Sequence, residues 1–226
     1  MHSYSTSVAL FDFVPVLISA VALLFLAQGI SHRHRGLAPV AWAAALLIPV
    51  GGLCKASWKL LVATQGLHLD WLENLLFVAL APGFVAMAFC LFHALRAWQA
   101  GQPGQHLPAS RLAAWLSFPV IGGLLLAAAF PEQRWWFFWL LAVTTVANIC
   151  LIVHAIRAAR WSGLGWSVSA SFVLSFTATL TLSGLSRLPD TEASAWLQES
   201  VNLTAQLTLA YGFWHLKRRM QEQDIS

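Results

Sequence analysis

The chain has 226 residues, of which 58% are hydrophobic and only 10% are charged. Soluble domains carry about 25% charged residues, so this composition, with a mean hydropathy of +0.68, excludes an ordinary water-soluble domain. The length accommodates about seven membrane-spanning helices of about 20 residues with short connections. We therefore expect an all-α integral membrane protein in which residues 1–226 form a single seven-helix transmembrane domain.

The predicted spans are apolar segments separated by turn-forming or charged residues. In chain order they cover residues 8–30, 38–61, 70–96, 111–130, 134–157, 165–186 and 195–216. Residues 165–186 also alternate hydroxyl and apolar side chains as a strand would. A lone strand cannot span a bilayer, because its backbone groups would be unpaired. We therefore predict a helix there as well, with small hydroxyl residues packed against a neighbouring helix.

Basic residues are distributed unevenly between the two sides of the predicted bundle. One side carries Arg33, Arg35, Arg96, Arg111, Arg157, Arg160, Lys217, Arg218 and Arg219. The other side carries Arg134 and Arg187, together with acidic loop residues such as Asp190. Since basic loops face the cytoplasm, we expect the N-terminus outside and the C-terminus in the cytoplasm of a multi-pass protein in the cell inner membrane. The net charge of +4 is thus a topology signal, and nucleic acid is not an expected partner.

The cysteines and the first residues of the chain show no sign of secretion. Cys54, Cys90 and Cys150 all lie within apolar segments, so we expect no disulfide framework. The N-terminal segment has neither a basic region nor a cleavage site of small residues, which argues against a cleaved signal peptide.

An HxxR pattern ends each odd-numbered predicted span. Its copies, 61 residues apart, are His32–Arg35, His93–Arg96, His154–Arg157 and His215–Arg218. This spacing indicates tandem duplication of helix hairpins, which some transporters use. The alternative is that histidine and arginine simply collect at the cytoplasmic ends of helices.

Two lysines lie inside the second predicted span, where an unpaired charge is costly. Lys55 and Lys59 are one turn apart on one helix face, toward the outer end of this span. The candidate partners at the same depth are Asp12, Glu73, Asn74, Glu199, Asn202 and Gln206. We expect these residues to form a polar pocket open to the outside, in which the lysines bind an anionic group and the carboxylates act as counter-charges or proton carriers. The alternatives are a buried ion-pair network that fixes helix order, and extension of Lys59 to the membrane interface.

Cysteine and histidine form two pairs near the predicted cytoplasmic face. Cys90 precedes His93 by three residues and Cys150 precedes His154 by four, so each pair shares a helix face. Two such helices side by side would offer ligands for zinc or copper, and imidazoles from two helices can ligate haem iron. The simpler interpretation is that these histidines and the neighbouring arginines meet lipid phosphates. We therefore predict no cofactor, with haem, Zn or Cu as the alternatives.

The sequence contains none of the common hydrolase, metalloprotease or nucleotide-binding motifs, and the seventh span has no lysine for a retinal Schiff base. The expected function is the binding or transport of a small ligand, with an anionic one favoured, through the outward-facing pocket. One alternative is a haem- or metal-binding redox protein that uses the inner-face histidines, and another is a membrane-embedded enzyme, although no residue combination singles out a nucleophile. A third is a non-catalytic subunit or sensor that acts through a partner protein or as a homo-oligomer.

Overall fold

The computed structural model describes residues 5–101, 109–185, 188–189 and 191–222, and within these ranges every regular element is helical. The elements are α1 (Thr6–Phe11), α2 (Phe13–Arg33), the 3-10 helix η1 (Arg35–Leu37), α3 (Ala38–Gln65), α4 (Asp70–Ala100), α5 (Ala109–Ala129), α6 (Trp135–Trp161), α7 (Trp166–Leu185) and α8 (Glu192–Glu222). The all-α fold class is thus confirmed. Arg187 and Asp190, used above to assign the sides of the bundle, lie outside the described residues.

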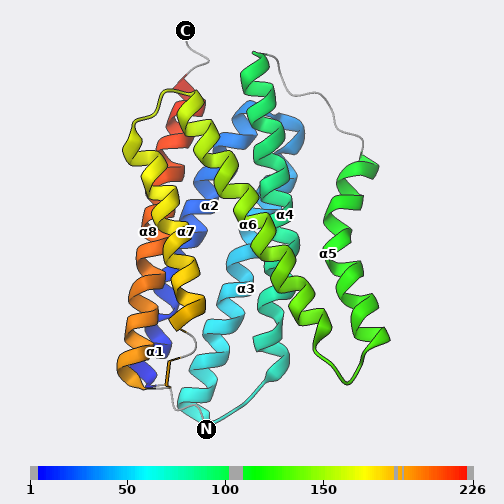
Figure 1. Cartoon of the computed structure of the whole chain (residues 1–226), viewed down its shortest axis with the longest axis vertical. Helices are drawn as coiled ribbons and strands as arrows, with labels where there is room; N and C mark the ends of the chain where they lie inside the picture. The colour runs from blue at the N-terminus through cyan, green and yellow to red at the C-terminus, as the bar shows by residue number, and fades with distance from the viewer. Residues whose placement is uncertain (1–4, 102–108, 186–187, 190, 223–226) are drawn as a thin grey trace.

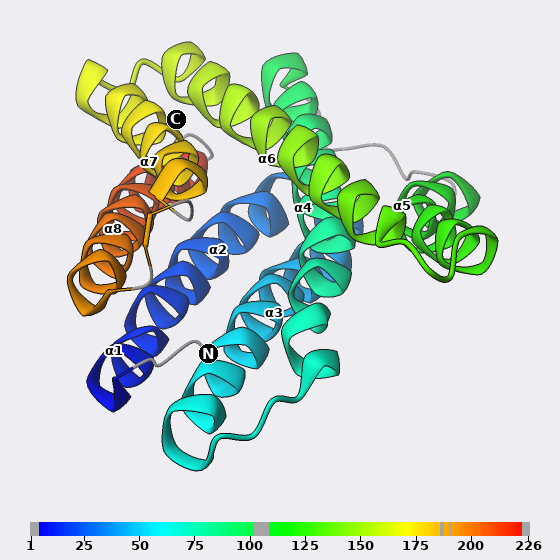
Figure 2. The ribbon, with the colours of Figure 1, turned by 60° about the horizontal axis from the view of Figure 1, so that its bottom comes forward.

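The long helices form one bundle and run roughly along a common direction (Figure 1). α2 packs between α3 and α8, and α4 packs against both α3 and α6. α7 flanks α8, while α5 lies at the edge of the bundle against α6 and α4 (Figure 2). We call the end of the bundle at which α1 lies the lower end, and the end at which α2, α4, α6 and α8 finish the upper end, as they are seen in Figure 1.

Five helices are long and apolar enough to cross a membrane. They cover Thr6–Arg33, Arg35–Gln65, Asp70–Ala100, Trp135–Trp161 and Trp166–Leu185. The segment Ala113–Ala129 of α5 is a shorter apolar helix. α8 has 31 residues but is less apolar, because six of the nine residues from Gln198 to Gln206 are polar.

Large apolar side chains on the outside of the bundle support the same class of fold. Leu17 and Leu46 are each 59% exposed, Val146 is 60% exposed and Leu124 is 64% exposed. Monomeric soluble proteins rarely expose extended apolar surface of this kind. Lipid tails would cover these side chains at no cost in hydration.

The first predicted span is interrupted at Asp12, which separates α1 from α2. Pro15 accounts for the break, because it has no backbone N–H to donate to the carbonyl of Phe11 and its ring clashes with that carbonyl in a regular helix. Each of the other predicted spans corresponds to a single helix, α3 to α8. The choice of a helix for residues 165–186 is confirmed by α7.

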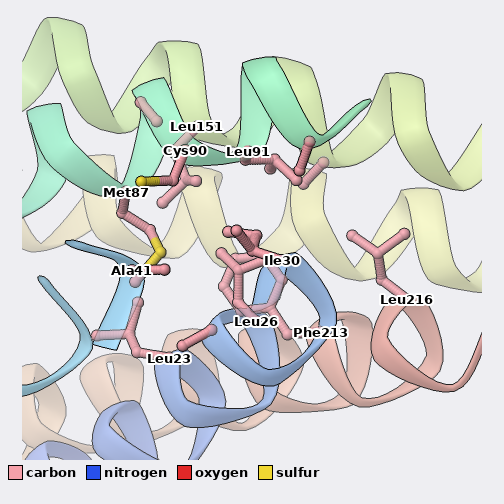
Figure 3. Packing of buried hydrophobic residues seen from close by; sticks show 14 of the residues in the cluster. Leu23, Leu26, Ile30, Ala41, Met87, Cys90, Leu91, Leu151, Phe213 and Leu216 are labelled. Carbon is pink, nitrogen blue, oxygen red and sulfur yellow. The ribbon is translucent and has the colours of Figure 1, made fainter. Parts of the chain in front are cut away.

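The apolar core lies toward the upper end of the bundle, because most of its residues belong to the halves of the helices nearer that end. Its buried side chains come from α2, α3, α4, α6, α7 and α8. Those labelled in Figure 3 are Leu23, Leu26, Ile30, Ala41, Met87, Cys90, Leu91, Leu151, Phe213 and Leu216. The lower half of the bundle is built differently, since its centre contains the charged residues described below.

Small residues allow the central helices to approach closely, as is usual for helices that pack within a membrane. A Cβ atom added to Gly51 of α3 would lie 2.9 Å from the backbone oxygen of Leu76 in α4. One added to Gly83 of α4 would lie 2.6 Å from the side chain of Ile48 in α3. The contact between α3 and α4 therefore has no room for a side chain at Gly51.

Candidate functional site

At the lower end of the bundle, one ammonium group lies between two carboxylates. Lys59 Nζ of α3 is 3.0 Å from Asp12 Oδ2 and 2.8 Å from Glu199 Oε1, to which it donates a hydrogen bond. Asp12 lies at the α1–α2 junction and Glu199 lies in α8, so the contacts join three separate parts of the chain. We call these three residues the Lys59 cluster.

The Lys59 cluster is shielded from solvent. Asp12 is 6% exposed and Glu199 is 4% exposed, while the side chain of Lys59 is 14% exposed. Charges in such a setting must be paired, because each one loses several kcal/mol of hydration. For Lys59, the geometry matches the alternative of a buried ion-pair network and not the extension of this side chain to the membrane interface.

Two polar groups at the Lys59 cluster are left without a direct partner among the described residues, namely the ammonium group of Lys55 and one of the two carboxylate oxygens of Glu199. Lys55 is half-buried and lies one turn away from Lys59 on α3, toward the centre of the bundle. It interacts electrostatically with Asp12, Glu73 and Glu199, but no carboxylate of the described chain lies within ion-pair distance. Glu199 Oε2 is buried and accepts no hydrogen bond from the described residues. A buried polar atom without a partner is unfavourable, so a ligand that satisfied both groups would bind favourably.

The other residues predicted for the pocket are arranged differently. Asn74 Oδ1 accepts a hydrogen bond from Arg134 Nη2 at 3.0 Å. Gln206 Nε2 donates to Asn202 Oδ1 at 3.3 Å, so these two amides bond to each other along α8. Glu73 is half-buried in the first turn of α4, and its side chain makes no hydrogen bond or ion pair within the described part of the chain. Of the predicted set, the structure brings only the members of the Lys59 cluster into direct ionic contact.

The contact between Arg134 and Asn74 was not foreseen from the sequence. In the sequence, Arg134 served only to assign the sides of the bundle, as one of the two basic residues on the less basic side. A signal was present, because the loop before α6 and the first turn of α4 belong to the same side of the predicted bundle. The sequence could not indicate that these two particular side chains face each other.

The cysteines and histidines near the upper end do not converge. Cys90 is fully buried in the core, whereas Cys150 is exposed. The ring of Phe92 lies next to both His93 and His154, at centroid distances of 5.1 and 5.2 Å. Among the residues whose positions are described, no group of three or more His, Cys, Asp or Glu side chains could hold a metal ion. This arrangement lends no geometric support to a zinc or copper site.

The described chain is all-helical and has five helices long and apolar enough to cross a bilayer, which is typical of helical membrane proteins, and it places acidic and basic side chains in contact inside the bundle. Comparison of the chain with protein-family models, with curated proteins and with solved structures found no match.

Proposed function

We propose that the chain crosses the cell inner membrane seven times, with its N-terminus outside and its C-terminus in the cytoplasm. α5 and α8 would join the five apolar helices as spans. The 21 residues of α5 extend about 30 Å, the thickness of a hydrocarbon core. α8 is longer, and its buried Glu199 is paired with Lys59, which lowers the cost of a carboxylate within a span.

The basic residues support this orientation. In the described part of the chain, the upper end carries Arg33, Arg96, Arg157, Arg160 and Arg218, whereas the lower end carries Arg134. Lys/Arg-rich ends face the cytoplasm in most membrane proteins. The Lys59 cluster would then lie in the outer half of the membrane.

We infer that the outer half binds a small ligand that carries both an anionic group and a hydrogen-bond donor. The observation that supports this function is the Lys55 ammonium, which has no described carboxylate at ion-pair distance, together with Glu199 Oε2, the one oxygen of the Lys59-paired carboxylate that accepts no hydrogen bond from the described residues. The anionic group of the ligand would pair with Lys55, and its donor would pair with Glu199. Amino acids and hydroxy acids have this chemistry. Lys59 is neutralised by two carboxylates, so its role would be to hold Asp12 and Glu199 in place.

Thermal unfolding of the purified protein in detergent, with and without a panel of amino acids and hydroxy acids, tests this function. A ligand at a hundred times its Kd stabilises the folded state by about 2.7 kcal/mol, which is readily measured as a rise in Tm. We expect Lys55→Met to abolish this rise. Analogues of the same ligand that lack the carboxylate should have no effect on the wild-type protein.

The matched control is Lys217→Met. It removes the one lysine that lies outside α3, at the opposite end of the bundle. This variant should retain the full rise in Tm. If Lys55→Met retained it as well, or if no member of the panel stabilised the wild-type protein, the proposed site would be wrong.

A further inference from the structure

A second cluster of charges lies at the opposite end of the molecule. A cavity of about 440 Å³ opens between the upper ends of α4 and α6. Its lining residues are Phe92, Leu95, Arg96, Gln99, His154, Arg157 and Arg160. We call this space the arginine cavity.

No carboxylate of the described residues balances the positive charge of the arginine cavity. Its lining contains no Asp or Glu, and none of its three arginines has a carboxylate within ion-pair distance among the described residues. His154 Nδ1 is buried and has no hydrogen-bond partner in the described part of the chain. Arg96 stacks on the ring of Phe92 and Arg160 on that of Trp166, at 5.2 and 4.6 Å from the ring centroids. An anion in this cavity would therefore meet guanidinium groups that contact aromatic rings but no described carboxylate.

A second cavity at the same end of the bundle differs from the arginine cavity, because its arginines have a carboxylate partner. The second cavity, of about 290 Å³, is lined by residues of the α6–α7 loop and by the end of α8. It contains Arg218 and Arg219, but Glu222 lies 3.7 Å from Arg218 and 4.0 Å from Arg219. Arg219 also donates a hydrogen bond to the backbone oxygen of Ser162 at 3.0 Å. These two arginines thus have partners within the protein.

The surface of α6 below the arginine cavity is apolar. Val146, Ile149 and Val153 are 60%, 40% and 40% exposed. Together with Arg157 and Arg160 they follow the three-to-four-residue spacing of one helix face. Phe92 and Leu95 of α4 add apolar lining to the cavity itself. An amphiphile would fit this face, with its charged head among the arginines and its apolar chain along the valine and isoleucine side chains.

We propose that the arginine cavity binds the phosphate of an anionic phospholipid headgroup. Arginine binds phosphate oxygens through two parallel hydrogen bonds, which a lysine cannot reproduce. Basic pockets between spanning helices on the cytoplasmic side are suited to such headgroups. A soluble phosphate ester shares the phosphate but not the acyl chain, and the apolar face of α6 favours the lipid. The assignment to the cytoplasmic leaflet rests on the orientation proposed above.

The test uses the purified full-length protein in a neutral detergent and native mass spectrometry to measure bound ligand. The probes are phosphatidylglycerol, phosphatidylcholine and glycerol 1-phosphate. We expect the wild-type protein to retain phosphatidylglycerol in preference to the other two. The double variant Arg157→Ala/Arg160→Ala should bind phosphatidylglycerol about tenfold more weakly or worse, a loss of about 1.4 kcal/mol or more. Both arginines are exposed, so the variant is expected to fold.

The control is Arg218→Ala, which removes an arginine at the same end of the bundle that is paired with Glu222. It should bind phosphatidylglycerol as the wild-type protein does. Equal binding of phosphatidylglycerol by the double variant would overturn the site, and equal binding of glycerol 1-phosphate by the wild-type protein would overturn the lipid as its occupant. Detergent micelles have no inside or outside, so lipid binding in this test does not depend on the orientation of the protein. An inverted orientation would change only which leaflet supplies the lipid. Failure of ligand binding at Lys55 would leave the measured phosphatidylglycerol binding unaffected.

Discussion

Replacing Lys59 with methionine removes the ammonium group of the Lys59 cluster while keeping a side chain of similar length. Asp12 and Glu199 would then be two buried carboxylates without the cation that both of them contact. Each of these contacts, at 2.8–3.0 Å, corresponds to about 6 kcal/mol of attraction at an effective dielectric constant of about 20. Much of that attraction offsets the hydration that the buried charges lose. We therefore expect Lys59→Met to lower the free energy of unfolding by about 3–5 kcal/mol, as for the loss of one partner from other buried ion pairs.

Reversible unfolding of the purified protein in mixed micelles, followed by far-UV circular dichroism, measures this loss. Lys55→Met is the matched control, because it makes the same chemical change one turn away on the same helix face at a residue without an ion pair among those described. Its effect should stay within about 1 kcal/mol. The triple variant Asp12→Asn/Lys59→Met/Glu199→Gln should recover most of the stability, since no carboxylate of the cluster is then left without its cation. Equal stability of Lys59→Met and Lys55→Met would refute the reasoning.

Two further predictions concern packing and orientation. Gly51→Ala should lower the free energy of unfolding by about 1–3 kcal/mol, because its Cβ would lie 2.9 Å from the backbone oxygen of Leu76. Gly184→Ala, which meets no atom within 4 Å, should leave stability unchanged or raise it by up to about 1 kcal/mol in the same unfolding assay. In a cysteine-free background, a membrane-impermeant maleimide should label Gln65→Cys on intact cells and Ala100→Cys only after permeabilisation. The reverse labelling pattern would contradict the proposed orientation.

The helices could be predicted from the sequence because long apolar segments and the breaks between them are local features. The interruption at Asp12 was missed, although Pro15 is a visible local cause. Residues 195–216 were predicted as a span in the same way as the others, but the polar residues of α8 make it the least apolar of the long helices.

The candidate site could be predicted only in part, because depth in the membrane can be counted along a helix but rotation about the helix axis cannot. The expected common depth of Asp12, Lys59 and Glu199 agrees with their direct contact. Asn74 was expected at that depth too, but the rotation of α4 places its amide oxygen against Arg134. For Lys55, the sequence predicted a partner, and the structure shows none among the described residues at ion-pair distance.

The ion pair between Lys59 and Glu199 joins residues 140 positions apart, which bears on how the chain enters the membrane during synthesis. Asp12 and Lys59 lie in helices made early, so they can pair long before α8 leaves the ribosome. Among the described long helices, α8 is made after the others and is the least apolar, and Glu199 opposes its transfer into lipid. An ammonium group already in place would offset that opposition. Membrane insertion of the C-terminal helix would then depend on a lysine translated much earlier, and a chain lacking Lys59 would be most prone to leave α8 outside the bilayer.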